Sequence, residues 1–404
     1  QTLNVANQVN PPRGMRDILP EDKVLRERLI SSVRQGYLAR GFQEVETPAL
    51  EDLSRLTSGQ GGDNEKLVFQ VLKRGDDLDA AISSGSGLAD LGLRFDLTVP
   101  LTRYFATNQA VLPRVFKAIQ IGPVWRAERP QKGRYRQFLQ CDIDIIGDAS
   151  ILAEAELLSA SLSALADLGL DDAIIRINHR EVLTQSISKI GVPEHEQLSA
   201  MVTIDKLDKL GIDGVIAELG EKFGKSVADA GFEWLSNLDQ SRFPEILQPL
   251  VDAMGPLASG IRYDASLVRG MGYYTGAIFE IEHPLASASI GGGGRYDSMV
   301  GKWSGTDAPA VGISLGIERI IELASLPKEQ TPSLVLMINS DALTGQALSI
   351  QSELIAQGFR CRIEFRQKNF KVQMASLAKQ GFEKLAQLDS GTVRASDLDI
   401  RAID

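Results

Sequence analysis

The segment from Val124 to Gly147 constrains the fold more than any other part of the chain. It begins with apolar residues, continues as a basic loop broken by Pro130 and Gly133, and then becomes apolar again. That order predicts an antiparallel hairpin, in which a long loop joins two strands. The tip of the hairpin would carry three basic residues, Arg129, Lys132 and Arg134.

The returning strand of this hairpin has two different faces, because successive residues of a strand point to opposite sides. One face mixes an aromatic ring, an amide and carboxylates: Phe138, Gln140, Asp142 and Asp144. The other face is apolar: Leu139, Cys141, Ile143 and Ile145. The apolar face is typical of a strand packed on a core. The polar face, beside Arg126 and Glu128, needs a polar partner, and an anionic planar molecule such as a nucleotide would suit it.

Composition narrows the class of protein. The 404 residues are enough for two or three domains with sizeable cores. No apolar run reaches the length of a membrane span, so we expect no membrane association. Two cysteines far apart in sequence favour a reducing cytoplasm, and with three scattered histidines they offer no metal-ligand spacing. The net charge of −10 argues against non-specific coating of nucleic acid, but not against a polyanion held by local basic patches.

Patterns along the first half of the chain predict a mixed α and β structure. Residues 21–40 and 150–169 are predicted to form amphipathic helices that end near a glycine. Residues 93–100 are predicted to form a strand with Asp96 and Thr98 on the same face. Residues 57–92 are rich in Ser, Gly and Asp, and we expect a mobile surface loop there, with one short strand at 67–72.

The second half of the chain predicts the domain boundaries. Residues 171–260 contain charged, helix-length segments and are predicted to form an inserted helical subdomain. Residues 327–333 are rich in Pro and polar residues and are predicted to be a linker. The order strand, helix, strand within 334–404 predicts a small α/β domain with a parallel sheet. The main domain would then combine residues 1–170 with residues 261–326.

Candidate binding residues occur in two sets. Three arginines lie in or beside strand-like segments, next to glycines or small residues: Arg126, Arg269 and Arg319. A guanidinium matches two phosphate oxygens and stays charged, so these arginines suit phosphate recognition, although no P-loop sequence is present. Acceptors and rings for a small polar substrate form the second set: Asp96, Gln140, Asp144, Tyr273 and Tyr274. Each residue alone is more typical of a structural role, and the two sets gain weight from occurring together.

A run of four glycines at 291–294 would let a ligand approach the backbone closely. A tight turn or a bulge would use the same residues, so the run is a weak signal by itself.

Together these segments resemble class II aminoacyl-tRNA synthetases, and within that class the histidyl-tRNA synthetase family. The stretch from Arg126 to Phe138 is similar to the second class II motif, residues 312–319 to the third, and residues 41–48 to the first. The segment Leu267-Val-Arg-Gly-Met-Gly-Tyr-Tyr-Thr275 is similar to the histidine-specific motif. The resemblance covers nearly the whole chain. It implies an α+β fold: a class II antiparallel sheet flanked by helices, a helical insertion and a C-terminal α/β anticodon-binding domain.

The resemblance also implies a role for each matching residue. The catalytic groups would be Arg126 and Arg269, with Arg269 where other class II enzymes place a metal ion. ATP would be bound by Arg126, Glu128, Arg134, Phe138 and Arg319. The amino group of histidine would be held by Asp96, Thr98 and Gln140, and its imidazole by Asp144 and Tyr274 beside Tyr273. The acceptor end of tRNA would meet Gln131 and Lys132.

The implied function is ATP-dependent activation of L-histidine to histidyl-adenylate, followed by transfer to the 3′ end of tRNA(His). ATP would be a substrate, and Mg²⁺ would accompany it. No tightly bound metal is implied. The protein is expected to be a cytoplasmic homodimer. The alternative is a catalytically silent relative, the synthetase-like regulatory subunit of ATP phosphoribosyltransferase in histidine biosynthesis. That family tends to lose the catalytic arginines and the C-terminal domain, and this chain keeps both. A plain nucleotide-binding module would not explain the Tyr-Tyr segment.

Overall fold

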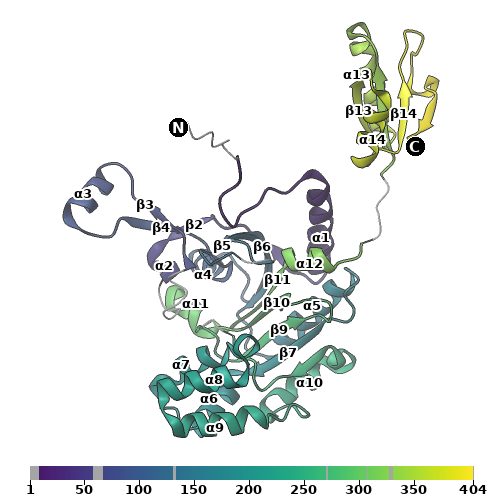
Figure 1. Ribbon diagram of the computed structural model, residues 1–404. Helices are drawn as coiled ribbons and strands as arrows, with labels where there is room; N and C mark the ends of the chain where they lie inside the picture. Colours follow the sequence, from purple (N-terminus) through teal and green to yellow (C-terminus); the bar gives the residue numbers. More distant parts are fainter. Residues whose placement is uncertain are drawn as a thin grey trace, which may run out of the picture. The chain divides into compact units, whose positions relative to one another are not determined.

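A computed structural model describes residues 9–57, 67–130, 133–269, 272–306, 308–326 and 331–403. The chain divides into two compact units, Gln1–Leu326 and Pro327–Asp404. An eight-stranded sheet forms the centre of the first unit (Figure 1). Among the helices that are described, none is both long and apolar enough to cross a membrane.

The eight-stranded sheet has the strand order β1-β5-β6-β11-β10-β9-β7-β8. In chain order its strands are β1 (Gln43–Glu44), β5 (Phe116–Trp125), β6 (Gln137–Ile146), β7 (Ile174–His179), β8 (Ile261–Tyr263), β9 (Ala277–Glu282), β10 (Gly291–Arg295) and β11 (Ala310–Gly316). The strands from β5 to β7 pair antiparallel, and the edge strands β1 and β8 pair parallel. The predicted antiparallel sheet and the predicted hairpin, which is the β5–β6 pair, are confirmed.

Four helices pack on one face of this sheet, and they gather on the same side of the unit in Figure 1. They are α1 (Pro20–Leu38), α5 (Ile151–Ala166), α10 (Gln248–Met254) and α12 (Ile317–Leu323). Helix α1 follows the predicted amphipathic pattern: its buried residues are Leu29, Ile30, Val33 and Tyr37, which share one stripe of the helix. The sheet side of this core includes Cys141, Ile143 and Ile145 of β6.

A second apolar core lies between α4 (Thr98–Asn108), α11 (Asp297–Ser304) and the helices of the predicted insertion. Those helices are α6 (Arg180–Lys189), α7 (Gln197–Ile204), α8 (Leu207–Phe223) and α9 (Lys225–Ser236). The predicted insertion also contains the short 3-10 helices η2 (Glu194–Glu196), η3 (Glu245–Leu247) and η4 (Gly255–Gly260), and Leu247 of η3 packs in the first core with α10. The helical part begins only at Arg180. Strand β7, whose Ile175 and Ile177 are buried on the core face, belongs to the main sheet.

Within residues 57–92, the predicted short strand at 67–72 is present as β3 (Gln70–Leu72), but the predicted loop over the rest of the range is wrong for the residues that the structure describes. Strands β2 (Leu50–Asp52), β3 and β4 (Ala89–Leu93) form a separate antiparallel sheet, accompanied by α2 (Leu53–Thr57) and α3 (Asp76–Ser84). The aspartates that suggested a loop lie in the first turn of α3: Asp76, Asp77 and Asp79. Acidic residues stabilise a helix at that end, because its first N–H groups carry partial positive charge.

The second unit is a small α/β domain, as predicted. Its sheet has the order β13-β12-β14-β15, formed by β12 (Ser333–Ile338), β13 (Arg360–Phe365), β14 (Lys384–Gln387) and β15 (Ile400–Ala402). The central strand β12 is buried throughout and pairs parallel with β13 and β14, whereas β15 pairs antiparallel. Its helices are α13 (Thr344–Ala356) and α14 (Phe370–Lys379), with η5 (Asp341–Leu343) and η6 (Ala395–Asp397). Residues 327–330 of the predicted linker lie outside the described residues.

Candidate active site

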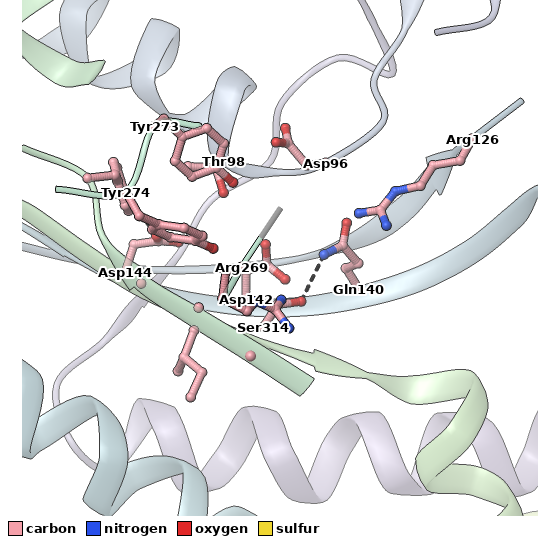
Figure 2. A pocket seen from close by; sticks show the side chains of 15 residues that line it. Asp96, Thr98, Arg126, Gln140, Asp142, Asp144, Arg269, Tyr273, Tyr274 and Ser314 are labelled. Atoms are coloured by element: carbon pink, nitrogen blue, oxygen red, sulfur yellow. Dashed lines mark hydrogen bonds between the residues drawn. The ribbon is translucent and has the colours of Figure 1, made fainter. Parts of the chain in front are cut away.

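One cavity brings together most of the residues predicted for the site (Figure 2). The predicted residues that line it are Asp96, Thr98, Arg126, Gln140, Asp144, Arg269, Tyr273 and Tyr274. It is also lined by Asp142, Gly292, Gly293, Tyr296, Gly312, Ile313 and Ser314. These residues are far apart in the sequence and meet because β6, β11 and β10 are neighbours in the sheet.

The polar face of β6 forms one wall of the cavity. Opposite it in register, β11 places Ser314 beside Asp142 and Gly312 beside Asp144. The Gln140 Nε2 donates to Ser314 Oγ at 2.8 Å. A Cβ on Gly312 would overlap Asp144 Oδ1, so only glycine there leaves room for the carboxylate.

Asp144 has a partner that the sequence patterns did not reveal. The Tyr296 hydroxyl donates to Asp144 Oδ1 at 2.6 Å, and both side chains are buried. Burial raises the pKa of the Asp144 carboxyl from 3.8 to about 7, although the bond from Tyr296 lowers it. The tyrosine therefore fixes the orientation of a carboxyl group that titrates near neutrality.

Two more buried carboxyl groups face the same cavity. Burial raises the pKa of Asp96 from 3.8 to about 6, and the charge of Arg126 opposes that rise. Burial also raises the pKa of Asp142 well above 3.8, and repulsion from Asp144 adds to the effect. Carboxylates that repel one another in a buried space favour binding of a cation between them.

Asp96 and Thr98 reach the cavity from the start of a helix. The predicted strand over 93–100 is wrong after its first residue, because β4 ends at Leu93 and α4 begins at Thr98. The Val99 N–H donates to Asp96 Oδ1 at 3.1 Å, so this carboxylate satisfies a free N–H of the first helical turn. The pair nevertheless lines the cavity, as the strand prediction also required.

Arg269 lies on the same face of the sheet as the β6 carboxylates. Its Nη1 donates to Glu280 Oε2 of β9 at 3.0 Å. A Cβ on Gly292 would lie 2.8 Å from both Cζ and Nη1 of Arg269. The four-glycine run belongs to strand β10. Because these residues have no side chains, the Arg269 guanidinium can lie directly against the sheet.

The paired tyrosines lie beside Arg269. The rings of Tyr273 and Tyr274 meet edge to face, with centroids 4.8 Å apart. Burial raises the pKa of both hydroxyls, so both stay protonated and can donate hydrogen bonds. A hydrogen bond with Thr98 lowers the pKa of Tyr273 and so opposes the effect of burial. This hydrogen bond links the tyrosine pair to the start of α4.

A second group of predicted residues gathers where the β5–β6 loop meets α12. The Arg126 guanidinium carbon lies 5.0 Å from the centroid of the Phe138 ring, and its Nε donates to Phe95 O at 3.0 Å. Arg134 Nη1 lies 3.7 Å from Glu128 Oε2. The pKa of Arg319 is lowered by burial and then by the charges of Arg134 and Arg126. This crowding of arginines favours an anion there.

Gln131 and Lys132, predicted to meet the tRNA acceptor end, lie outside the described residues. In the described part of the chain, no group of three or more His, Cys, Asp or Glu side chains is arranged to hold a metal ion.

Sequence reasoning missed several residues that complete the site. Asp142 was visible in the alternation of β6 but received no role. Ser314 shares a strand face with Gly312, and Tyr296 directly follows the glycine strand, so period-2 spacing could have found the first and proximity the second. The pairing of Arg269 with Glu280 depends on the register of β9 and β10, which no local pattern encodes.

Comparisons with known proteins agree on one family. The family model described as histidyl-tRNA synthetase matches residues 14–320. The chain is 48% identical over 419 residues to the histidine–tRNA ligase of Leifsonia xyli subsp. xyli, covering 96% of this chain and 97% of that protein. It is 39% identical over 412 residues to the probable histidine–tRNA ligase of Tropheryma whipplei, covering 95% and 96%. The crystal structure of histidyl-tRNA synthetase from Nostoc sp. PCC 7120 aligns with a TM-score of 0.75 at 26% identity, over 98% of this chain and 94% of that chain.

Proposed function

The chain belongs to the histidyl-tRNA synthetase family, and from that membership we propose which side chains bind each substrate and carry out the reaction. Its function is that of a histidine–tRNA ligase. ATP activates L-histidine to histidyl-adenylate with release of pyrophosphate, and the histidyl group then passes to the 3′ end of tRNA(His).

The observation that carries the proposal is the charge pattern of one cavity, in which two arginines face three buried carboxyl groups. An amino acid has a cationic ammonium and an anionic carboxylate. Asp96 would hold the ammonium, and the arginines would draw the carboxylate toward the α-phosphate of ATP.

Arg126 and Arg269 act on the reacting atoms. When an oxygen of the histidine carboxylate attacks the α-phosphorus, a new O–P bond forms and the P–O bond to the leaving pyrophosphate breaks. Negative charge grows on the oxygens around phosphorus, and fixed guanidinium groups stabilise it without having to reorganise. The contacts of Arg126 with Phe95 and of Arg269 with Glu280 hold the two groups in place beforehand.

The remaining ATP contacts are proposed for the group beside α12. Phe138 would stack on one face of adenine, and Arg319 would cover the other face while reaching the terminal phosphate. Glu128 would contact the adenine end and Arg134 the triphosphate. Mg²⁺ would enter with ATP and neutralise phosphate charge.

Histidine itself would be recognised by two subsites. Asp96, Thr98 and Gln140 would hold its amino group. Asp144 and Tyr274, beside Tyr273, would bind its imidazole ring. Imidazole offers one donor and one acceptor nitrogen, and a carboxylate plus a phenol can satisfy both. An apolar side chain of similar size would leave both partners without a hydrogen bond, which is the basis of selectivity.

We also propose the assembly and the tRNA contacts. The second unit would contact tRNA(His) as the anticodon-binding domain, and the 131–132 segment would meet the acceptor end. A homodimer would form through the first-motif segment, residues 41–48, because it contains β1, an edge strand of the sheet. Both cysteines are free, which supports a cytoplasmic location. Light scattering that gives the mass of a monomer would overturn the homodimer.

The experiment that tests the function is ATP–pyrophosphate exchange with each amino acid in turn. We expect exchange with L-histidine alone. Exchange with none of them would favour the non-catalytic regulatory subunit. That alternative is less well supported, because Arg126 and Arg269 both line the cavity and the relatives described above are named as ligases.

A further inference from the structure

Asp142 is a buried acidic side chain without a complete set of hydrogen-bond partners. It lies in the middle of β6 and is 4% exposed. Its Oδ1 has no hydrogen-bond partner among the described residues, and the side chain lines the cavity. An unpaired carboxylate oxygen in the interior destabilises the folded state, so its retention calls for a ligand that supplies a donor.

Three neighbours of Asp142 make hydrogen bonds with other residues. Gln120, opposite it on β5, accepts from Thr47 Oγ1 at 3.1 Å and donates to Leu97 O at 2.8 Å. Arg126 donates its Nε to Phe95 O. Arg94 donates Nη1 to Thr47 O at 2.6 Å and Nε to Pro123 O at 3.0 Å. No ion pair joins Asp142 to either arginine within the described part of the chain.

The remaining neighbour, Ser314, orients the side chains of Gln140 and Asp142 on this wall of the cavity. Its Oγ accepts from Gln140 Nε2, so its own hydroxyl proton is free for Asp142, and hydrogen bonding with Ser314 lowers the otherwise raised pKa of that carboxyl. With the Nε2 of Gln140 turned to Ser314, its Oε1 faces away and is also buried without a partner. Figure 2 shows Gln140, Ser314 and Asp142 together on this wall of the cavity.

Asp96 supplies a third unsatisfied acceptor. Its Oδ1 caps α4, and its Oδ2 is buried without a partner. The cavity therefore holds three buried acceptor atoms that lack donors: Asp96 Oδ2, Gln140 Oε1 and Asp142 Oδ1. A primary ammonium group has three N–H donors, which matches this number, whereas an imidazole N–H would satisfy one acceptor and leave two.

We propose that the Asp142 carboxylate accepts a hydrogen bond from the α-ammonium group of the substrate and completes the amino-group subsite with Asp96 and Gln140. This inference rests on the proposed function of the cavity in histidine binding. It gives Asp142 a role in substrate binding that neither the motif comparison nor the histidine-specific segment indicates. It also explains why the strand keeps an aspartate facing the cavity at its centre.

The test compares ligands that carry different parts of histidine. L-Histidine has the ammonium, the imidazole and the carboxylate. Histamine lacks the carboxylate, and 3-(imidazol-4-yl)propionate lacks the ammonium.

Dissociation constants are measured by calorimetry on the full chain, for the wild type and for Asp142→Ala and Asp142→Asn. We expect Asp142→Ala to weaken L-histidine and histamine by about 10- to 100-fold, the range for a hydrogen bond to a charged group, and to leave imidazolepropionate unchanged. Asp142→Asn keeps an acceptor but not the charge and should weaken the same two ligands less.

The matched control is Asp144→Asn, which should weaken all three ligands because each has the imidazole. Equal weakening of all three ligands by Asp142→Ala, or of none, would overturn the role of Asp142. A thermal melt of each variant separates loss of folding from loss of binding. If the wild type itself fails to bind L-histidine, the proposed function fails instead, before the variants are compared.

Discussion

The two faces of β6 are buried to the same degree and have opposite chemistry. On the core face, Cys141, Ile143 and Ile145 are each at most 1% exposed and pack under α1 and α5. On the site face, Gln140, Asp142 and Asp144 are at most 8% exposed and face the cavity. One strand therefore contributes both to the apolar core and to the wall of the cavity, and only the period of two separates the two faces.

The difference shows what a binding site costs the fold. Burial of an aliphatic side chain on the core face stabilises the folded state by about 1.5–3 kcal/mol. The carboxyl groups of the site face are destabilising when ionised, which is why burial raises the pKa of Asp142 and Asp144. Truncation on the core face should therefore lower stability and leave activity nearly unchanged, whereas changes on the site face should lower activity and can raise stability.

The largest expected effect is a loss of activity from the site face. Arg269→Ala removes a fixed cation from the cavity, so it should slow histidine-dependent ATP–pyrophosphate exchange by about 100-fold or more, the usual scale for one electrostatic group. Histidine binding should remain largely intact. The matched control is Arg262→Ala, which removes a half-exposed arginine that pairs with Glu282 at 2.6 Å outside the cavity. An Arg269→Ala exchange rate near that of wild type would remove Arg269 from the reaction.

On the core face, Ile143→Ala should act on stability instead. Ile143 is fully buried, and truncation would leave a cavity under the helices, so the free energy of unfolding should fall by about 3 kcal/mol. Chemical denaturation measures this loss, with Ile151→Ala as the control because Ile151 is 39% exposed. The Michaelis constant for histidine should stay within about twofold under conditions where the variant is folded. A large rise in that constant would show that the two faces are not independent.

The alternation of β6 was predictable because it is local. Period-2 spacing assigned Cys141 to the core and Asp144 to the site, and both assignments agree with the structure. The same spacing misled at 93–100, where a polar–apolar alternation belongs to a helix N-terminus that Asp96 caps. Tertiary pairing also explains β7, a short strand in a charged region that becomes a strand only because β8 and β9 flank it.

Partners across strands could not be predicted from the sequence alone. The bond from Tyr296 to Asp144 joins residues that are 152 positions apart. The bond from Arg269 to Glu280 joins residues that are 11 positions apart, and Arg269 lies against Gly292, which is the partner of Glu280 in the register of β9 and β10. Resemblance to a family predicted residues for substrate binding, and eight of them line the cavity. It did not identify those that hold them in place.

A smaller effect concerns stability and pH at Asp144. Its pKa is about 7 in the folded chain and 3.8 as an ordinary aspartate. Between these values the folded state binds a proton that the unfolded state does not, so the free energy of unfolding falls as pH rises through the window. Asp144→Asn cannot titrate. The stability advantage of the variant over wild type should therefore grow by about 3 kcal/mol between pH 4.5 and pH 8.

Thermal midpoints of the two proteins at both pH values measure this prediction for Asp144→Asn. The variant should bind histidine at least about tenfold more weakly, because the amide accepts more weakly than a carboxylate. A stability difference that is the same at both pH values would show that Asp144 titrates normally in the folded chain.

The smallest expected effect is at Glu280, on β9, where the same alternation recurs: Phe279 and Ile281 face the core, and Glu280 contacts Arg269. Glu280 also accepts from Arg176 Nη1 at 2.9 Å, so it is held between two guanidinium groups. Glu280→Gln would set an amide N–H against one of them and let Arg269 move from its productive position. We expect kcat for exchange to fall about fivefold with little change in the Michaelis constant for histidine, because the arginine acts on the transition state.

Glu282→Gln is the matched control, two residues along the same strand: Glu282 pairs with Arg262, and no ion pair joins it to Arg269 within the described residues. If both variants lower kcat equally, or if Glu280→Gln lowers the thermal midpoint as much as it lowers kcat, Glu280 stabilises the sheet rather than positioning Arg269.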